Sequence, residues 1–299
     1  MHEDTGCGQR RVCVDQGAST STVPPERYIE PETVMEPQRP QMVPSGIVIA
    51  TPAYGEQVHS AYCDALVRTV AGLQAAGHQV AWGTNSLRAI RAGRAHLAAK
   101  ALATSATHIL WVDPNISWEP GAVEKLLAHN LPMVAGLCPK KKAQVEFCAT
   151  EAVGPDGALR TQGEHLIELA GVDISFVLIK REVFEAIMEA HPERHLHGLW
   201  PDETSPLWPW LYDFFPEELP GGGSLVSGDL GFCRLWRDLG GEIWADTSIV
   251  LRHHGQWAFT VETVAASPAE FLAPTLARMK AAGRTSDSEG GTPSTSLRP

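Results

Sequence analysis

The stretch "ILWVDPNISWEP", residues 109 to 120, places an acidic turn directly after an apolar run. The β-branched and aromatic residues before Asp113 are typical of a buried strand. Asp113, Pro114 and Asn115 all favour turns, so a simple strand-to-helix connection is one interpretation. A metal site is the other, because carboxylate and amide oxygens ligate hard divalent cations and side chains two apart can point the same way.

The segments on either side of this stretch alternate between strand and helix patterns. Apolar runs typical of strands occupy residues 46–51, 78–84, 107–113 and 131–137, and helical spacing occupies 58–77, 90–104 and 119–130. This alternation predicts an α/β fold with a mostly parallel sheet flanked by helices. Ligands of such sheets bind at the carboxyl ends of the strands, which is where Asp113 and Asn115 are expected.

The second half of the chain has a less regular pattern. It predicts strands at 145–150, 166–180 and 242–255, helices at 181–190 and 230–241, and a long irregular stretch over 199–229. Irregular stretches of this length are usually binding loops or lids. We expect a disordered tail over 1–45, one folded domain over 46–267, a peripheral helix over 268–283 and a second disordered tail over 284–299.

Composition excludes several classes of protein. The formal charge of -11 argues against a general nucleic-acid coat, although a local basic groove stays open. No apolar run approaches the ~20 residues of a membrane helix, and the N-terminus has no apolar signal core, so no membrane partner is expected. The six cysteines are scattered without zinc-site spacing. These features favour a reduced, cytoplasmic protein.

Several charged residues fall near the predicted ligand edge. Asp229 follows Ser227, a suitable helix cap, so it is either an acid stabilised by the helix dipole or a general base aimed at a ligand. His253 and His254 end the last strand, as surface residues or as metal ligands. Basic clusters follow the second and fourth strands, and from them we select Arg94 and Lys140 as phosphate contacts.

Taken in order, these segments resemble the short, soluble GT-A glycosyltransferases often carried by bacteriophages. The motifs that carry the resemblance are "IATPAYGEQVHSAYCDAL", "IRAGRAHL", "WVDPNISWEP", "GLCPKK", "ISFVLIKREVF" and "SGDLGFCRLWRDLGGEIWADTSIVLRHHG". Their order and spacing extend over residues 46–259, nearly the whole predicted domain. The chain departs from the group at Asn115, Gly228 and Ala95, where the group carries an acid, a glutamate and an asparagine.

The resemblance implies a Rossmann-like GT-A fold with a smaller antiparallel region on the acceptor side, and a sugar transfer from a nucleotide-sugar donor, such as a UDP-sugar, with inversion. It implies that Asp113, Asn115 and His253 hold Mn²⁺ or Mg²⁺ and that Asp229 is the base. The implied donor contacts are Thr51, Pro52, Tyr54, Arg94, Asp113 and Lys140.

The aromatic residues of the irregular stretch are the predicted cover of the acceptor, because sugar faces and nucleobases stack on aromatic rings. They are Trp208, Trp210, Tyr212 and Phe214. The acceptor itself stays open between a saccharide, a small molecule, a protein and a hydroxymethylated base in DNA, which would have to leave the stack. The three departures also motivate an alternative of a different class, a nucleotide-binding module without catalysis.

Overall fold

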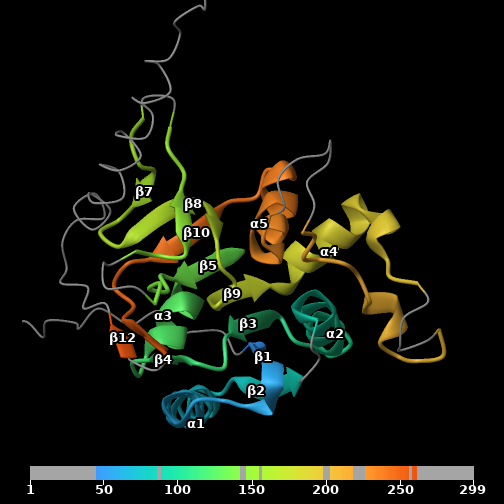
Figure 1. Cartoon of the computed structure of the whole chain (residues 1–299), viewed down its shortest axis with the longest axis horizontal. Coiled ribbons are helices and arrows are strands. Elements are labelled where there is room, and N and C mark those ends of the chain that lie inside the picture. The colour runs from blue at the N-terminus through green and yellow to red at the C-terminus, as the bar shows by residue number, and fades with distance from the viewer. Residues whose placement is uncertain are drawn as a thin grey trace, which may run out of the picture. The chain divides into compact units, whose positions relative to one another are not determined.

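The computed structural model describes residues 45–85, 89–141, 146–154, 157–197, 203–217, 226–255 and 258–260. They form a large sheet, a small sheet and helices on both faces of the large sheet (Figure 1). The predicted tails and the peripheral helix over 268–283 lie outside the described residues.

The large sheet has nine strands among the described residues. In spatial order they are β2 (Gln79–Asn85), β1 (Gly46–Pro52), β3 (His108–Val112), β9 (Phe176–Lys180), β5 (Met133–Gly136), β10 (Ile243–Asp246), β8 (Leu166–Val172) and β6 (Ala149–Glu151), with β7 (Thr161–Gln162) also paired to β8. Only β9 and β8 run against the other strands. The predicted α/β class with a mostly parallel central sheet is therefore confirmed.

Alternation along the central strands divides the core into two layers. On β1, Ile47 and Ile49 pack with α1 (Ser60–Ala75) and α3 (Ala122–His129). Val48 and Ala50 pack on the opposite face with α2 (Ile90–Leu102), α4 (Arg181–Ala190) and α5 (Gly228–Asp238). A strand covered on both faces needs apolar residues at every position, which explains the unbroken run that β1 shows in the sequence.

A small antiparallel sheet lies beside the end of β3. It has the order β12 (Ala258–Thr260), β11 (Leu251–His254) and β4 (Ile116–Trp118). Because β4 follows the Asp113–Asn115 turn immediately and pairs with β11, His253 lies opposite Ile116. The sequence pattern did not predict β4, but this short strand joins the two segments that carry the candidate metal ligands.

Two predicted strands are each divided in the structure. The run over 166–180 becomes β8 and β9 because the chain turns at 173–175. The run over 242–255 becomes β10 and β11 because Asp246 closes a turn, its Oδ1 accepting a hydrogen bond from the Ser248 amide at 2.7 Å. Both runs are apolar on each side of the break, so periodicity alone could not locate the turns.

Three short 3₁₀ helices complete the described elements: η1 (Tyr54–Glu56), η2 (Pro192–Arg194) and η3 (Trp208–Trp210). No helix among the described residues is long and apolar enough to span a bilayer.

Candidate functional site

Asp113 follows the last residue of β3, at the carboxyl edge of the sheet, as predicted. Its amide donates a hydrogen bond to the Ser175 carbonyl at 3.0 Å, which ties it to the start of β9. Burial raises the pKa of the Asp113 carboxyl, while the positive charges of Arg94 and His253 act to lower it. A carboxyl group that is costly to ionise and surrounded by cations is a common feature of functional sites.

Asn115 anchors the turn to β11. Its backbone carbonyl accepts a hydrogen bond from the His254 amide at 2.8 Å, and its Nδ2 donates to the His254 carbonyl at 3.1 Å. These bonds fix the position of β11 relative to Asp113. The side chain of Asn115 therefore has a positioning role here, and its predicted role as a metal ligand stays a prediction.

His253 is oriented by the loop that follows β5. Its Nδ1 lies 2.9 Å from the Pro139 carbonyl and 3.6 Å from the Cys138 thiol. Burial acts to lower the pKa of His253, but the contacts with Cys138 and Pro139 outweigh it and the pKa is raised. A proton on Nδ1 leaves the Nε2 lone pair for a ligand, which is the usual second-shell arrangement of a metal-binding histidine.

A divalent cation can be tested against these residues. Within the described ranges, no group of three or more His, Cys, Asp and Glu side chains is placed to hold a metal ion. Asp113 and His253 nevertheless influence one another electrostatically, and Mg²⁺ is often held by one or two protein groups together with substrate phosphates. The residues therefore fit a cation shared with a diphosphate rather than a closed structural site.

Asp229 and Arg94 form an ion pair in the interior. Their side chains are 14% and 7% exposed, and Asp229 Oδ2 also accepts a hydrogen bond from the Ile174 amide at 3.2 Å. Burial lowers the pKa of Arg94, while the charges of Asp113 and Asp173 act to raise it. Arg94 thus has three carboxyl groups in its surroundings.

The start of α5 agrees with the sequence prediction. Ser227 is the cap, since its Oγ accepts a hydrogen bond from the Leu230 amide at 3.3 Å, and Asp229 lies in the first turn. Gly228 lies in close contact with Phe215. A Cβ at Gly228 would lie 2.9 Å from the Phe215 carbonyl, so no larger residue fits without a shift of backbone.

Lys140 is the phosphate contact predicted from the sequence, and this role stays a prediction. Lys140 pairs with Glu146 at 3.6 Å. The Lys141 side chain lies beside Gly255, with Nζ 3.7 Å from where a Cβ would stand, and its charge acts on Asp113 and His253. Arg88 and Lys142, from the same two basic clusters, lie outside the described residues.

Asp173 is a charged residue near Asp113 and Arg94 that the sequence motifs did not indicate. It lies in the turn between β8 and β9, and its charge acts on both Asp113 and Arg94. The signal was present in the sequence, because Asp173 is the one acid that interrupts the apolar run from Ala170 to Ile179. An acid inside such a run often marks a turn at the end of a strand.

The predicted donor contacts near β1 are divided by the structure. Thr51 is fully buried, and its hydroxyl lies within hydrogen-bonding distance of Tyr62 and Trp82, so it joins α1 to β2, and its predicted contact with the donor stays a prediction. Pro52 is half-buried at the end of β1. Tyr54 is 62% exposed in η1, as a stacking surface for a base requires.

The loop that carries Tyr54 leads directly to the acidic turn. The His59 amide donates a hydrogen bond to the Pro114 carbonyl at 2.8 Å, and the His59 ring stacks on His254 with ring centroids 4.1 Å apart. Tyr54 and Asp113 are therefore carried by two connected loops at the same edge.

The predicted acceptor residues belong to a segment that packs against α2. Phe214 is fully buried against Phe184, so its assignment to the acceptor is corrected to a core role. Trp210 has the Arg181 guanidinium 4.7 Å above its ring. Trp208 and Tyr212 are half-buried and both contact the His195 ring.

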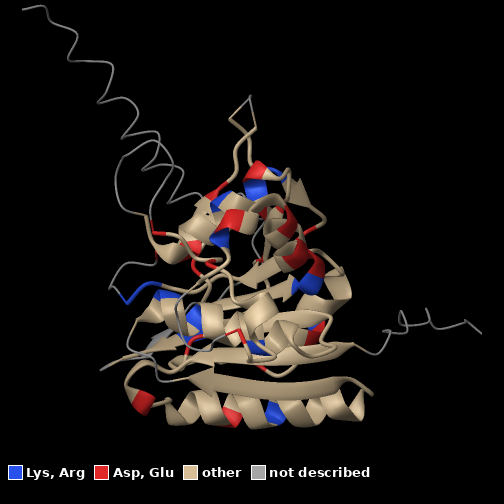
Figure 2. Cartoon of the chain, turned by 90° about the vertical axis from the view of Figure 1, so that its right-hand side faces the viewer, with Lys and Arg blue, Asp and Glu red and all other residues tan. Residues whose placement is uncertain are grey.

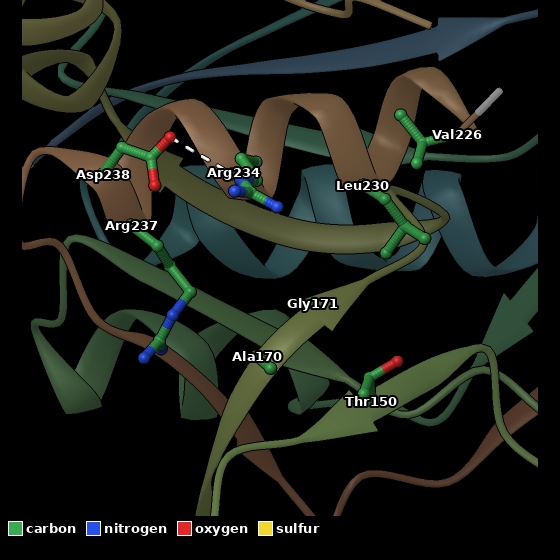
Figure 3. A pocket seen from close by; sticks show the side chains of 8 residues that line it. All are labelled: Thr150, Ala170, Gly171, Val226, Leu230, Arg234, Arg237 and Asp238. Atoms are coloured by element: carbon green, nitrogen blue, oxygen red, sulfur yellow. Dashed lines mark ion pairs between the residues drawn. The ribbon is translucent and has the colours of Figure 1, made fainter. Parts of the chain in front are cut away.

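A cavity of about 400 Å³ lies between α5 and the strands β8 and β6 (Figure 3). Its lining residues are Thr150, Ala170, Gly171, Val226, Leu230, Arg234, Arg237 and Asp238. None of the residues predicted from the sequence lines this cavity.

Lysine, arginine, aspartate and glutamate residues are interspersed over the elements seen in Figure 2, and that view shows no single basic face.

No protein-family model and no curated protein matches the chain. Among solved structures it is similar to A197 from STIV, at 13% identity over 74% of this chain and 96% of that chain, with a TM-score of 0.42. It is also similar to a glycosyltransferase involved in the glycosylation of the major capsid of PBCV-1, at 10% identity over 67% and 92% of the chains, with a TM-score of 0.29. A third similar structure is HddC from Yersinia pseudotuberculosis, at 10% identity over 65% of this chain and 97% of that chain, with a TM-score of 0.30. Similarity at this level does not define an activity, which has to be inferred from the site itself.

Proposed function

We propose that the chain is a metal-dependent glycosyltransferase that moves a sugar from a nucleotide-sugar donor to an acceptor hydroxyl with inversion. The observation that carries this proposal is the meeting of Asp113, Arg94, Asp229 and His253 at the carboxyl edge of the sheet. These residues come from β3, α2, α5 and β11, and their types match the chemistry that the resembling family needs.

The donor is held from three directions in this proposal. Asp113 and the Nε2 of His253 would ligate Mn²⁺ or Mg²⁺, which would neutralise charge on the diphosphate as it leaves. Arg94 and Lys141 would contact the phosphate oxygens directly, because guanidinium and ammonium groups are the usual phosphate binders. The exposed ring of Tyr54 would stack on the uracil of a UDP-sugar.

Asp229 would act as the general base. It accepts the proton of the acceptor hydroxyl while the hydroxyl oxygen forms a bond to the anomeric carbon, and the bond from that carbon to the diphosphate oxygen breaks. The hydrogen bond from the Ile174 amide holds the carboxylate in one orientation during this step. Trp208 and Tyr212 remain the predicted acceptor contacts.

A donor panel read by thermal shift and by turnover tests the proposal. We expect UDP-sugars to raise the melting temperature only when Mn²⁺ or Mg²⁺ is present, because a ligand that binds only the native state stabilises it. Asp113→Ala should lose the metal-dependent part of this shift. Asp238→Ala, at an exposed carboxylate on α5, is the matched control and should retain it. A shift that is equal with and without chelator would contradict the cation assignment.

One observation favours the alternative of a binding module. Both oxygens of Asp229 already face Arg94, and a base needs a free oxygen toward the acceptor. If the panel detects UDP binding but no hydrolysis or transfer with any donor, the module is the better description. An acceptor screen that includes hydroxymethylated DNA then distinguishes the acceptor classes.

A further inference from the structure

Two free cysteines, Cys138 and Cys148, lie close together beside the candidate site, and the Cys138 thiol is 3.6 Å from His253 Nδ1. Cys138 follows β5 and Cys148 precedes β6. Pro139 and Phe147 form an antiparallel bridge, and the Cys148 amide donates a hydrogen bond to the Cys138 carbonyl at 3.0 Å. This register places Cys138 directly opposite Cys148, so their side chains lie on the same face of the ladder.

The distance between the two cysteines suits a disulfide. Directly opposed, hydrogen-bonded residues of an antiparallel ladder have Cα atoms about 5.5 Å apart, and disulfides join Cα atoms about 4.4 to 6.8 Å apart. The Cys148 thiol is the largest influence on the pKa of Cys138, which it lowers, and the Cys138 thiol is the largest influence on the pKa of Cys148, which it raises. The bond can therefore form without a large movement of the backbone.

The other cysteines that the structure describes are placed differently. Cys63 is exposed on α1. Cys233 is 1% exposed on α5, and its thiol lies 3.4 Å from the Val172 carbonyl, to which it donates a hydrogen bond. Among these four cysteines, the geometry singles out Cys138 and Cys148 as a pair.

We propose that Cys138 and Cys148 are a reversible dithiol–disulfide pair that exchanges with small-molecule disulfides. The thiolate of one cysteine attacks the small disulfide, forming a mixed disulfide and releasing one small thiol. The sulfur of the other cysteine then attacks the protein sulfur of the mixed disulfide and releases the second small thiol. Two electrons and two protons pass from the pair to the small disulfide, and excess small thiol reverses both steps.

The disulfide changes the candidate site in two ways. It removes the S–H group that lies 3.6 Å from His253 Nδ1. It also ties together the two ends of the connection that carries Lys140 and Lys141. The redox state of the pair therefore acts on one predicted metal ligand and on one predicted phosphate contact, while the pairing itself does not depend on the proposed transfer reaction.

Peptide mapping of the full chain tests the pair. The protein is equilibrated at a series of ratios of reduced to oxidised glutathione, quenched with N-ethylmaleimide, digested and analysed by mass spectrometry. We expect a linked peptide containing Cys138 and Cys148 to become the main form as the oxidised fraction rises, and to disappear with dithiothreitol. The proposal is overturned if both residues stay as thiols, or carry only glutathione, under conditions that fully glutathionylate Cys63.

Single serine variants provide the controls. Cys138→Ser and Cys148→Ser should each abolish the linked peptide, and Cys148→Ser should leave Cys138 as a thiol or a glutathione adduct. Cys63→Ser should leave the linked peptide unchanged. Donor binding measured on the same samples separates the two proposals: a linked peptide without donor binding counts only against the glycosyltransferase, and donor binding without a linked peptide counts only against the disulfide.

Discussion

Two arginines one turn apart on α2 each reach an aspartate far along the chain, and the two pairs are built differently. Arg91 binds Asp213 through two hydrogen bonds of 2.8 Å and 2.6 Å. Arg94 forms an ion pair with Asp229. A second cation, Arg194, lies 3.3 Å from Asp213, so the first pair has an excess of positive charge.

The second pair has the opposite balance. The carboxyl groups of Asp113 and Asp173 both act on Arg94, in addition to its partner Asp229. An acid with two arginines has its charge satisfied within the protein. Arg94 is instead shared among three carboxyl groups, one of which, Asp113, also feels the charges of His253 and Lys141. The Asp213 pair fixes the aromatic segment to α2, whereas the Asp229 pair belongs to the site that we propose receives the donor.

The largest effect is expected at Asp229. Asp229→Asn should lower kcat for transfer by about 10² to 10⁴, because that is the usual contribution of a general base, and should leave metal-dependent donor binding within about twofold. Single-turnover transfer and donor titration measure the two quantities. Near-wild-type transfer by this variant would mean that the Arg94 pair is structural, like that of Arg91.

Asp213→Asn should act on stability instead. Removing one partner of a buried ion pair usually costs about 3 to 5 kcal/mol, and we expect about 2 kcal/mol because Arg91 is 44% exposed and can regain water. Urea unfolding measures the loss. The control is Asp64→Asn, at an exposed pair with Arg68, which should change the free energy of unfolding by less than about 0.5 kcal/mol.

Local sequence signals were enough to place several parts of the site. The apolar run before Asp113 predicted β3 and its edge, and Ser227 predicted the start of α5. These features depend on neighbours within a few residues, so one sequence contains them. The division of residues 166–180 into β8 and β9 depends on pairing with distant strands. The position of Asp173 near Arg94 depends on the same pairing.

The correction of Phe214 has the same physical origin. A cluster of aromatic residues in an irregular stretch of sequence does not show whether one of its side chains faces the core or a ligand. Lys140 and Lys141 are adjacent in the sequence, and only the register of the connection after β5 decides which of them faces His253. Long-range register is not encoded in any short motif, and it decided each of these residues.

The two lysines provide the next test of the comparison. Lys141→Met should raise the KM for the donor about tenfold, which corresponds to about 1.4 kcal/mol, because it removes one charge from the acid-rich site. Lys140→Met should change KM by less than about twofold, since Lys140 already pairs with Glu146 at the surface. Steady-state kinetics at a fixed metal concentration compares the two variants. The reverse order would restore the original assignment of Lys140.

The smallest effect is expected in the aromatic segment. Trp210→Leu removes the ring beneath the Arg181 guanidinium but keeps most of the apolar contact, so the free energy of unfolding should fall by about 1 kcal/mol. The KM for the acceptor should stay within about twofold, because one face of the Trp210 ring is already occupied by Arg181. Thermal or urea unfolding and acceptor kinetics are measured on the same preparation. A tenfold rise in the acceptor KM without a loss of stability would show that the segment held by the Asp213 pair is itself part of the site, and the distinction between the two arginine pairs would then fail.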